Sequence, residues 1–77
     1  MKIVVLNTKG KAYEGEIKSA IIPTSLGLIG ILKNHAPLLT QVVPGKAILR
    51  TPEGEKEFEV GNGVLEVNNN LLTLLSR

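Results

Sequence analysis

The sequence lacks most of the residues that small domains use for chemistry or for cross-linking. It has no cysteine, so neither a disulfide bond nor a thiolate metal site can stabilise it. Its only histidine, His35, has no aspartate in the chain to orient it, which argues against nucleophilic catalysis. No apolar run approaches the roughly 18 residues of a membrane span, and the apolar start is too short for a signal peptide. These absences favour a soluble domain in a reducing compartment.

The length and the charge balance limit the domain further. The 77 residues are enough for one domain, which we expect to cover residues 1–77. The hydrophobic fraction of 43% suffices for a core, but only Tyr13 and Phe58 are aromatic, so that core must be aliphatic. A net charge of +2 and a pI of 9.2 come from interspersed charges. This mild surplus is not the basic stripe of a nucleic-acid-binding domain, so we expect no nucleic-acid partner.

Short apolar or alternating segments separated by turn residues fill the chain. No segment has a helical repeat with caps, and the pattern predicts an antiparallel β-sandwich or barrel. Phe58 and Val60 should point inward from a strictly alternating strand, and Pro23 should end an earlier strand because it lacks a backbone donor. We expect strands at residues 2–7, 13–23, 28–32, 38–43, 46–51, 55–60, 64–67 and 71–75.

The stretch from residue 27 to residue 40, GLIGILKNHAPLLT, is the least generic part of the sequence. Asn34 adopts a positive φ at low cost, which predicts a turn between two strands. Pro37 forces Ala36 into an extended conformation and allows a new strand to start. We interpret His35 as a turn residue that bonds nearby backbone.

No pattern in the chain indicates a catalytic, metal or cofactor site. Glu55, Glu57 and Glu59 share one strand face, but a solvated face explains three carboxylates more simply than a hard cation does. The phosphate-loop motif is missing. We therefore expect no autonomous enzyme, no cofactor and no metal.

Three segments are apolar on both faces, at residues 3–6, 26–32 and 71–75. Either all three are central strands of the sandwich, or another protein covers part of this surface. The residues alone favour neither explanation.

Four motifs in register resemble the N-terminal β-domain of the ATP synthase epsilon subunit. The family's Gly-Glu-[Leu/Phe]-Gly-[Ile/Val] run and His-Ala-Pro-Leu-Leu-Thr turn correspond to residues 27–31 and 35–40. Besides this central motif, three further motifs, aromatic-Glu-Gly-Glu, Pro-Gly and Gly-Gly-[Phe/Ile]-Leu-Glu-Val, correspond to residues 13–16, 44–45 and 61–67. The resemblance runs from Met1 to the last strand and implies an all-β fold, a small flattened antiparallel β-sandwich of about ten short strands.

The resemblance also implies a function. It predicts a non-catalytic subunit of the central stalk (the rotor) of an F-type ATP synthase, which binds the gamma subunit and rests on the c-ring to couple ion flow to ATP synthesis. The chain would be a monomer when isolated. It would lie at the cytoplasmic face of the energy-transducing membrane and touch that membrane only through the complex. Carried over by position, the gamma contacts are His35, Ala36 and Thr40, and the c-ring contacts are Ser25, Leu28 and Lys33.

Three features depart from the family pattern. The sequence stops at Arg77, before the helical hairpin that family members usually carry, so no role of that hairpin is expected here. Leu28 replaces the family's glutamate, which would make a contact with the ring more apolar. Lys33 and Asn34 replace Pro-Gly, and Asn34 should preserve the turn.

Two other classes of protein are compatible with parts of the pattern. A small basic β-barrel that binds RNA or single-stranded DNA fits the pI, but such sites stack bases on aromatic rings and this chain has two. A carboxylate-based hydrolase would need two glutamates that converge across strands.

Overall fold

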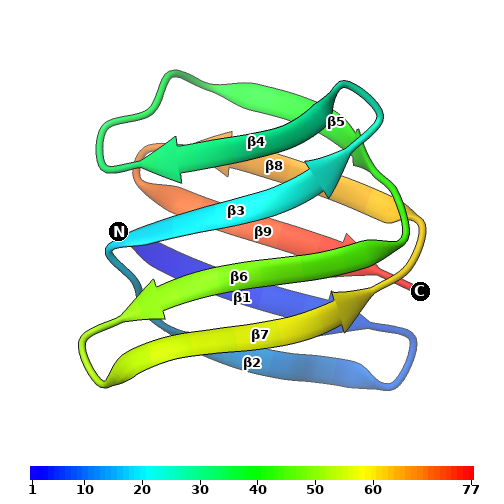
Figure 1. Cartoon of the computed structure of the whole chain (residues 1–77), viewed down its shortest axis with the longest axis horizontal. Helices are drawn as coiled ribbons and strands as arrows, with labels where there is room; N and C mark the ends of the chain where they lie inside the picture. The colour runs from blue at the N-terminus through cyan, green and yellow to red at the C-terminus, as the bar shows by residue number, and fades with distance from the viewer.

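The computed structural model describes all 77 residues and contains only β-strands and connecting segments (Figure 1). There is no helix long and apolar enough to cross a membrane. The predicted all-β class is confirmed, with nine strands where about ten were expected. They are β1 (Lys2–Asn7), β2 (Gly10–Glu16), β3 (Ser19–Thr24), β4 (Gly27–Leu32), β5 (Leu38–Val42), β6 (Gly45–Thr51), β7 (Gly54–Val60), β8 (Gly63–Asn68) and β9 (Leu71–Ser76).

The strands form one curled sheet that folds over into two layers (Figure 1). One layer has the order β2-β1-β9-β8-β5, and the other has the order β4-β3-β6-β7. The layers are joined where Thr24 of β3 pairs with Val42 of β5. All pairs are antiparallel except β1 with β9, which run parallel. The predicted antiparallel sandwich is therefore right in architecture, with one parallel pair at the centre of a layer.

The core lies between the layers and is aliphatic, as the shortage of aromatics predicts. It contains 14 buried hydrophobic residues, and the two aromatic rings pack against it from the side. Inward-facing residues alternate with outward-facing ones along each strand, because successive side chains of a strand point to opposite faces. The largest fully buried side chains are Ile3, Ile22, Ile31, Leu49, Leu65, Leu72 and Leu74.

The single strand expected at residues 13–23 is wrong, because the chain changes layers within it. β2 ends at Glu16 and β3 begins at Ser19 in the other layer. Odd-numbered residues point inward before this crossover and even-numbered ones after it, so Ala20 and Ile22 are buried while Ile21 is exposed. The alternation rule holds only within one strand, and it fails wherever a chain passes from one layer to the next.

Pro23 does not end its strand, contrary to expectation. β3 continues to Thr24, and Pro23 lies opposite Leu28 of β4. β3 pairs with β6 only from Ser19 to Ile21. Pro23 lies beyond this pairing, so its lack of an N–H breaks no hydrogen bond of the sheet.

The three segments that are apolar on both faces have two different positions in the sheet. β1 and β9 lie inside a layer, with neighbours on both sides. β4 pairs only with β3 and is an edge strand. Central position therefore explains two of the segments, and it leaves residues 26–32 unexplained.

Candidate partner-binding surface

The two margins of the sandwich are built differently. At the first margin, which we call the β2–β7 margin, Tyr13 of β2 and Phe58 of β7 close the gap between the layers. Their ring centroids are 5.3 Å apart and their planes are tilted by 50°. The Nζ atom of Lys56 lies 6.0 Å from the centroid of the Tyr13 ring. Phe58 is half-buried and Val60 is buried, which confirms the inward direction predicted for both.

Charges surround the β2–β7 margin. Glu14 on β2 forms ion pairs with Lys11 and with Lys2, the latter at 2.9 Å. The hydrogen bonds that Lys11 and Lys2 donate lower the pKa of Glu14 to about 2, and the positive charges of the two lysines act in the same direction. The bond to Glu14 likewise raises the pKa of Lys2. On β7, Glu57 pairs with Lys46 of β6 at 3.5 Å.

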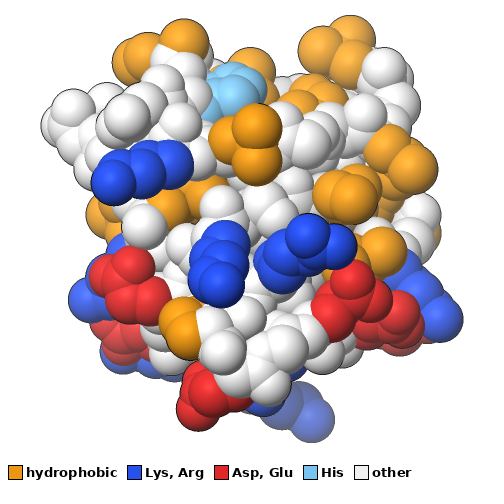
Figure 2. Space-filling model, turned by 60° about the vertical axis from the view of Figure 1, so that its left-hand side comes forward, with side chains coloured by type: hydrophobic (Ala, Val, Ile, Leu, Met, Phe, Trp, Pro, Cys, Tyr) orange, Lys and Arg blue, Asp and Glu red, His pale blue; other side chains and the backbone are white.

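The opposite margin, formed by β4 and β5, is apolar and exposed. We call it the β4–β5 margin and define it by four leucines: Leu26 (79% exposed), Leu28 (74%), Leu32 (65%) and Leu39 (73%). Figure 2 shows the contrast between the margins: the red side chains and most of the blue ones lie in the lower part, and orange ones lie above, near the histidine. Exposed leucines concentrated along one margin are typical of an interaction surface.

The turn between β3 and β4 holds Leu26 in its exposed position. The Thr24 hydroxyl donates to the Gly27 carbonyl at 2.7 Å and accepts from the Leu26 N–H at 3.1 Å. Thr51 makes the same two bonds in the turn between β6 and β7. Both turns have a threonine followed three residues later by a glycine, and both glycines have positive φ. This spacing is a signal in the sequence from which the turn at residues 24–27 could have been predicted.

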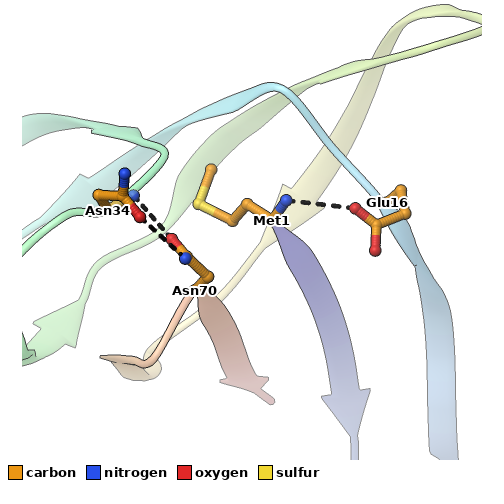
Figure 3. A network of polar contacts seen from close by, with 4 residues as sticks. All are labelled: Met1, Glu16, Asn34 and Asn70. Atoms are coloured by element: carbon orange, nitrogen blue, oxygen red, sulfur yellow. Dashed lines mark hydrogen bonds and ion pairs between the residues drawn. The ribbon is translucent and has the colours of Figure 1, made fainter.

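Asn34, in the turn between β4 and β5, is hydrogen-bonded to Asn70, in the turn between β8 and β9 (Figure 3). The Asn34 N–H donates to Asn70 Oδ1 at 2.6 Å, and Asn70 Nδ2 donates to Asn34 Oδ1 at 3.0 Å. Both residues have positive φ, 64° for Asn34 and 60° for Asn70. The positive φ predicted for Asn34 is confirmed, but its partner lies 36 residues away and had no local signal.

His35 is held by nearby backbone, as the sequence suggested. The backbone N–H of His35 donates to the Leu32 carbonyl at 3.1 Å. Its Nδ1 atom lies 2.7 Å from the carbonyl oxygen of Ala36, a contact that requires a hydrogen on Nδ1. The ring therefore braces the turn, and this leaves Ala36 and Pro37 exposed at its tip.

All six predicted contact residues lie along the β4–β5 margin, but their grouping differs from the predicted one. Ser25 and Thr40 are close together, because the Ser25 N–H donates to the Gln41 carbonyl at 3.0 Å. Leu28 lies at the same end of β4, since it is paired with Pro23. Lys33, His35 and Ala36 lie at the opposite end, in the turn that follows Leu32. Each predicted set of three therefore contributes to both ends of the margin.

The sequence pattern gave no sign of a hollow beside this margin. It has a volume of about 880 Å³ and lies on the outer face of β5, β8 and β9. Leu39, Val64 and Leu75 supply its apolar lining, and Thr40 and Gln41 lie beside them. Gln41, Val64 and Leu75 are neighbours in register across three strands, so the hollow continues the apolar surface of the margin.

The positions of the aromatic rings and glutamates bear on the two alternative functions, nucleic-acid binding and carboxylate-based hydrolysis. The two aromatic rings pack on each other and on the core, so neither presents a free face for base stacking. Glu55, Glu57 and Glu59 lie on an exposed strand face. No group of three or more histidine or glutamate side chains is placed to hold a metal ion.

Comparison with known proteins identifies the relatives of this chain. The ATP synthase epsilon chain of Persephonella marina is 43% identical over 72 residues, which are 92% of this chain and 53% of that protein. The epsilon chain of Sulfurihydrogenibium sp. is 39% identical over 75 residues, 96% of this chain and 56% of that protein. The chain thus spans about half the length of the curated relatives that it matches.

Solved structures show the same fold. A chain of the Euglena gracilis mitochondrial ATP synthase, solved as an OSCP/F1/c-ring assembly, superposes with a TM-score of 0.88 at 18% identity, covering 96% of this chain and 48% of that one. A chain of the Tetrahymena thermophila mitochondrial ATP synthase central stalk and c-ring gives 0.83 at 13% identity, covering 99% and 62%. The family model for the β-sandwich domain of the ATP synthase delta/epsilon chain matches residues 1–77. The chain therefore belongs to the ATP synthase delta/epsilon family and comprises its β-sandwich domain.

Proposed function

We propose that this chain is a non-catalytic subunit of the central stalk of an F-type ATP synthase. It binds the gamma subunit, rests on the c-ring, and so couples ion flow to ATP synthesis. The observation that carries this proposal is the exposed apolar β4–β5 margin in a member of the epsilon family. In the proposed complex the chain is peripheral to the energy-transducing membrane, on its cytoplasmic face, and reaches it only through the other subunits.

The contacts are distributed along the margin. We assign His35, Ala36 and Thr40 to gamma. Ser25, Leu28 and Lys33 are assigned to the c-ring. A turn that is fixed before binding loses little conformational entropy on binding, so the Asn34 turn suits a docking surface. The exposed leucines supply the apolar area that a stable interface buries.

Co-expression with the gamma subunit of the same source tests the proposal. We expect a one-to-one complex that elutes together in size-exclusion chromatography and buries at least ~1,000 Å² in total. The isolated chain should elute as a monomer. Separate elution of the two proteins at micromolar concentration would contradict the proposal.

Substitution of Ala36 tests the location of the contact. Ala36 is exposed at the tip of the turn, so Ala36→Asp should leave the isolated fold unchanged. In the complex the new carboxylate would be buried without a partner, and the affinity should fall by about 3 kcal/mol. Ala12→Asp is the matched control, because Ala12 is equally exposed but lies on β2 at the opposite margin. Equal losses in the two variants would place the contact elsewhere.

A further inference from the structure

The direction of the backbone groups in β3 follows from two hydrogen bonds. The Ser25 N–H donates to the Gln41 carbonyl at 3.0 Å, and the Val43 N–H donates to the Pro23 carbonyl at 3.1 Å. Ser25 and Pro23 flank Thr24, and both direct their backbone groups to β5. Because backbone groups alternate in direction along a strand, those of Thr24 point the other way, to β4.

The same alternation defines the free edge of β4. Gly27 is the register partner of Thr24, so it directs its backbone groups to β3. Every second residue after it does the same, and the residues between them turn their N–H and C=O groups away from β3. No other strand pairs with this side of β4. The residues with outward backbone groups are Leu28, Gly30 and Leu32, and only the Leu32 carbonyl has a partner, the His35 N–H.

This edge lacks the protection that the β2 and β7 edges have. β2 and β7 are edge strands that carry charged side chains, which discourage the addition of further strands. β4 has the sequence GLIGIL and no charge. An uncharged edge strand with free hydrogen-bonding groups is a template for another strand.

Gly30, at the middle of this edge, has no role within the chain that requires glycine. Its φ is not positive, and a Cβ atom built on it would meet nothing within 4 Å. Glycine within a strand lowers stability, and it often marks a place where another backbone comes close. Leu28 and Leu32 flank it along β4, and the exposed Ile21 of β3 lies opposite it. The result is a gap in an otherwise apolar surface, open to a side chain from outside.

We propose that β4 accepts an additional β-strand from the gamma subunit, paired with the backbone of Leu28, Gly30 and Leu32, so that Leu28 meets gamma through its backbone and leaves its exposed side chain to the c-ring. This inference rests on the proposed function and specifies how gamma is recognised. The added strand is uncharged, because it lies against leucines and meets no compensating charge on β4. It places a large apolar side chain beside Gly30, where it packs on Ile21 and fills the gap. His35 and Ala36 continue the same margin beyond Leu32.

A second copy of this chain fits the edge less well. Two β4 strands that paired antiparallel about Gly30 would place one glycine opposite the other. The gap would then remain, and the pair would lack the cross-strand side-chain contacts that stabilise a sheet. The geometry therefore favours a strand from a different protein.

Amide hydrogen exchange measured by NMR tests the proposal without a mutation. In the free chain the Gly30 amide should exchange fast, while the Ile29 and Ile31 amides, which bond to β3, should be protected. In the complex with gamma the Gly30 amide should become protected by at least ~100-fold. A Gly30 amide that exchanges equally fast in the free chain and in the complex would overturn the proposal.

Two substitutions at Gly30 separate the backbone bond from the side chain. Gly30→Pro removes the outward N–H but no bond to β3, and proline is tolerated at such edge positions. It should weaken binding to gamma by about 10- to 100-fold, because one bond is lost and the partner carbonyl is left unsatisfied. Gly30→Ala is the matched variant, because it keeps the N–H and its single methyl group takes up only part of the gap, so it should weaken binding less than Gly30→Pro does. Equal binding by the two variants would overturn strand addition.

The controls keep this inference separate from the proposed function. If the wild-type chain forms no complex with gamma, the proposed function itself fails. If the wild-type chain binds and Gly30→Pro binds equally well, only strand addition fails. Should Gly30→Pro lose the β-rich circular dichroism spectrum of the parent, Gly30→Glu replaces it. This charge reproduces the protection found on β2 and β7, and it should weaken binding more than Gly30→Ala does.

Discussion

Asn34 and Asn70 join the turn between β4 and β5 to the turn between β8 and β9, in the opposite layer. Asparagine is suited to this task because it tolerates positive φ better than other residues with side chains, and its amide group both donates and accepts. Glycine at either position would keep the backbone conformation. At position 70 it would remove both bonds, and at position 34 it would remove only the bond that Asn70 Nδ2 donates. The side chains of the pair therefore link the two layers, which the backbone conformation of the turn alone would not do.

A double-mutant cycle measures this link. Asn34→Gly removes one of the two bonds and should lower the free energy of unfolding by about 1 kcal/mol, the net value of an ordinary hydrogen bond, and Asn70→Gly removes both and should cost about 2 kcal/mol. Glycine is the right replacement because it fits positive φ without strain. The double variant should lose less than the sum of the single losses, by about 0.5–1.5 kcal/mol in urea unfolding. Additive losses would mean that the two side chains do not stabilise each other.

Glu14 predicts a dependence of stability on pH. Its pKa is about 2 in the folded chain, below the ordinary value of 4.5, because Lys11 and Lys2 bond the carboxylate. A lowered carboxyl pKa contributes stability above the unfolded value, and that contribution is lost as pH falls from 4.5 toward 2. Glu14→Gln should therefore lower the Tm at pH 7, and the difference from the parent should shrink as the pH approaches 2.

Glu53→Gln is the control for the charge change, because Glu53 is exposed in a turn and forms no ion pair. Its Tm should follow that of the parent at every pH. High salt should reduce the Glu14 effect, because this pair is exposed and therefore screened. A Glu14→Gln variant with the same Tm as the parent at pH 7 would show that the ion pairs add nothing to stability.

At the scale of the element, β2 and β7 form a margin that depends on one pair of rings. Phe58 is only half-buried, so its truncation should cost less than the roughly 3–5 kcal/mol of a fully buried phenylalanine. We expect Phe58→Ala to lower the free energy of unfolding by about 2 kcal/mol, measured in urea. Tyr13→Ala should couple to it by about 0.5–1.5 kcal/mol, as aromatic pairs do. A loss below about 1 kcal/mol for Phe58→Ala would show that the ring is not part of the packed margin.

Local residue chemistry predicted the turns and most of the strands, because these depend on neighbours in sequence. The positive φ of Asn34 and the inward side chain of Phe58 are examples. The crossover after Glu16 was missed because nothing in a period-two pattern marks a change of layer. The edge position of β4 was missed for a related reason. A strand that is apolar on both faces has the same sequence whether it is central or covered by another protein.

At the scale of the molecule, charge and apolar surface lie on opposite margins. The β2–β7 margin is charged, and the β4–β5 margin has four exposed leucines (Figure 2). The predicted contact residues all lie on the apolar margin, but the sequence could not order them along it. Ser25 and Lys33 are eight positions apart in sequence, and only the fold of β4 as a straight strand places them at opposite ends.

This asymmetry predicts how the isolated chain behaves at high concentration. Leu32→Glu places a charge on the apolar margin at a residue that is 65% exposed. The free energy of unfolding should change by no more than about 0.5 kcal/mol, as for other surface substitutions. The solubility limit, measured by light scattering against ammonium sulfate, should rise, because a contiguous apolar patch is interrupted. Equal solubility of Leu32→Glu and the parent would show that the margin does not promote self-association.

The parallel pairing of β1 with β9 has a consequence for synthesis on the ribosome. β1 and its neighbour β9 are about 70 residues apart in sequence, so β1 leaves the exit tunnel well before β9 is made. Until residues 71–76 emerge, only the hairpin with β2 is available to β1, and an isolated hairpin is marginally stable at best in water. Ile3 and Val5, which are buried in the finished molecule, must stay exposed until β9 emerges. The nascent chain therefore carries exposed apolar side chains through this interval, and the layer is completed in one step when β9 joins it.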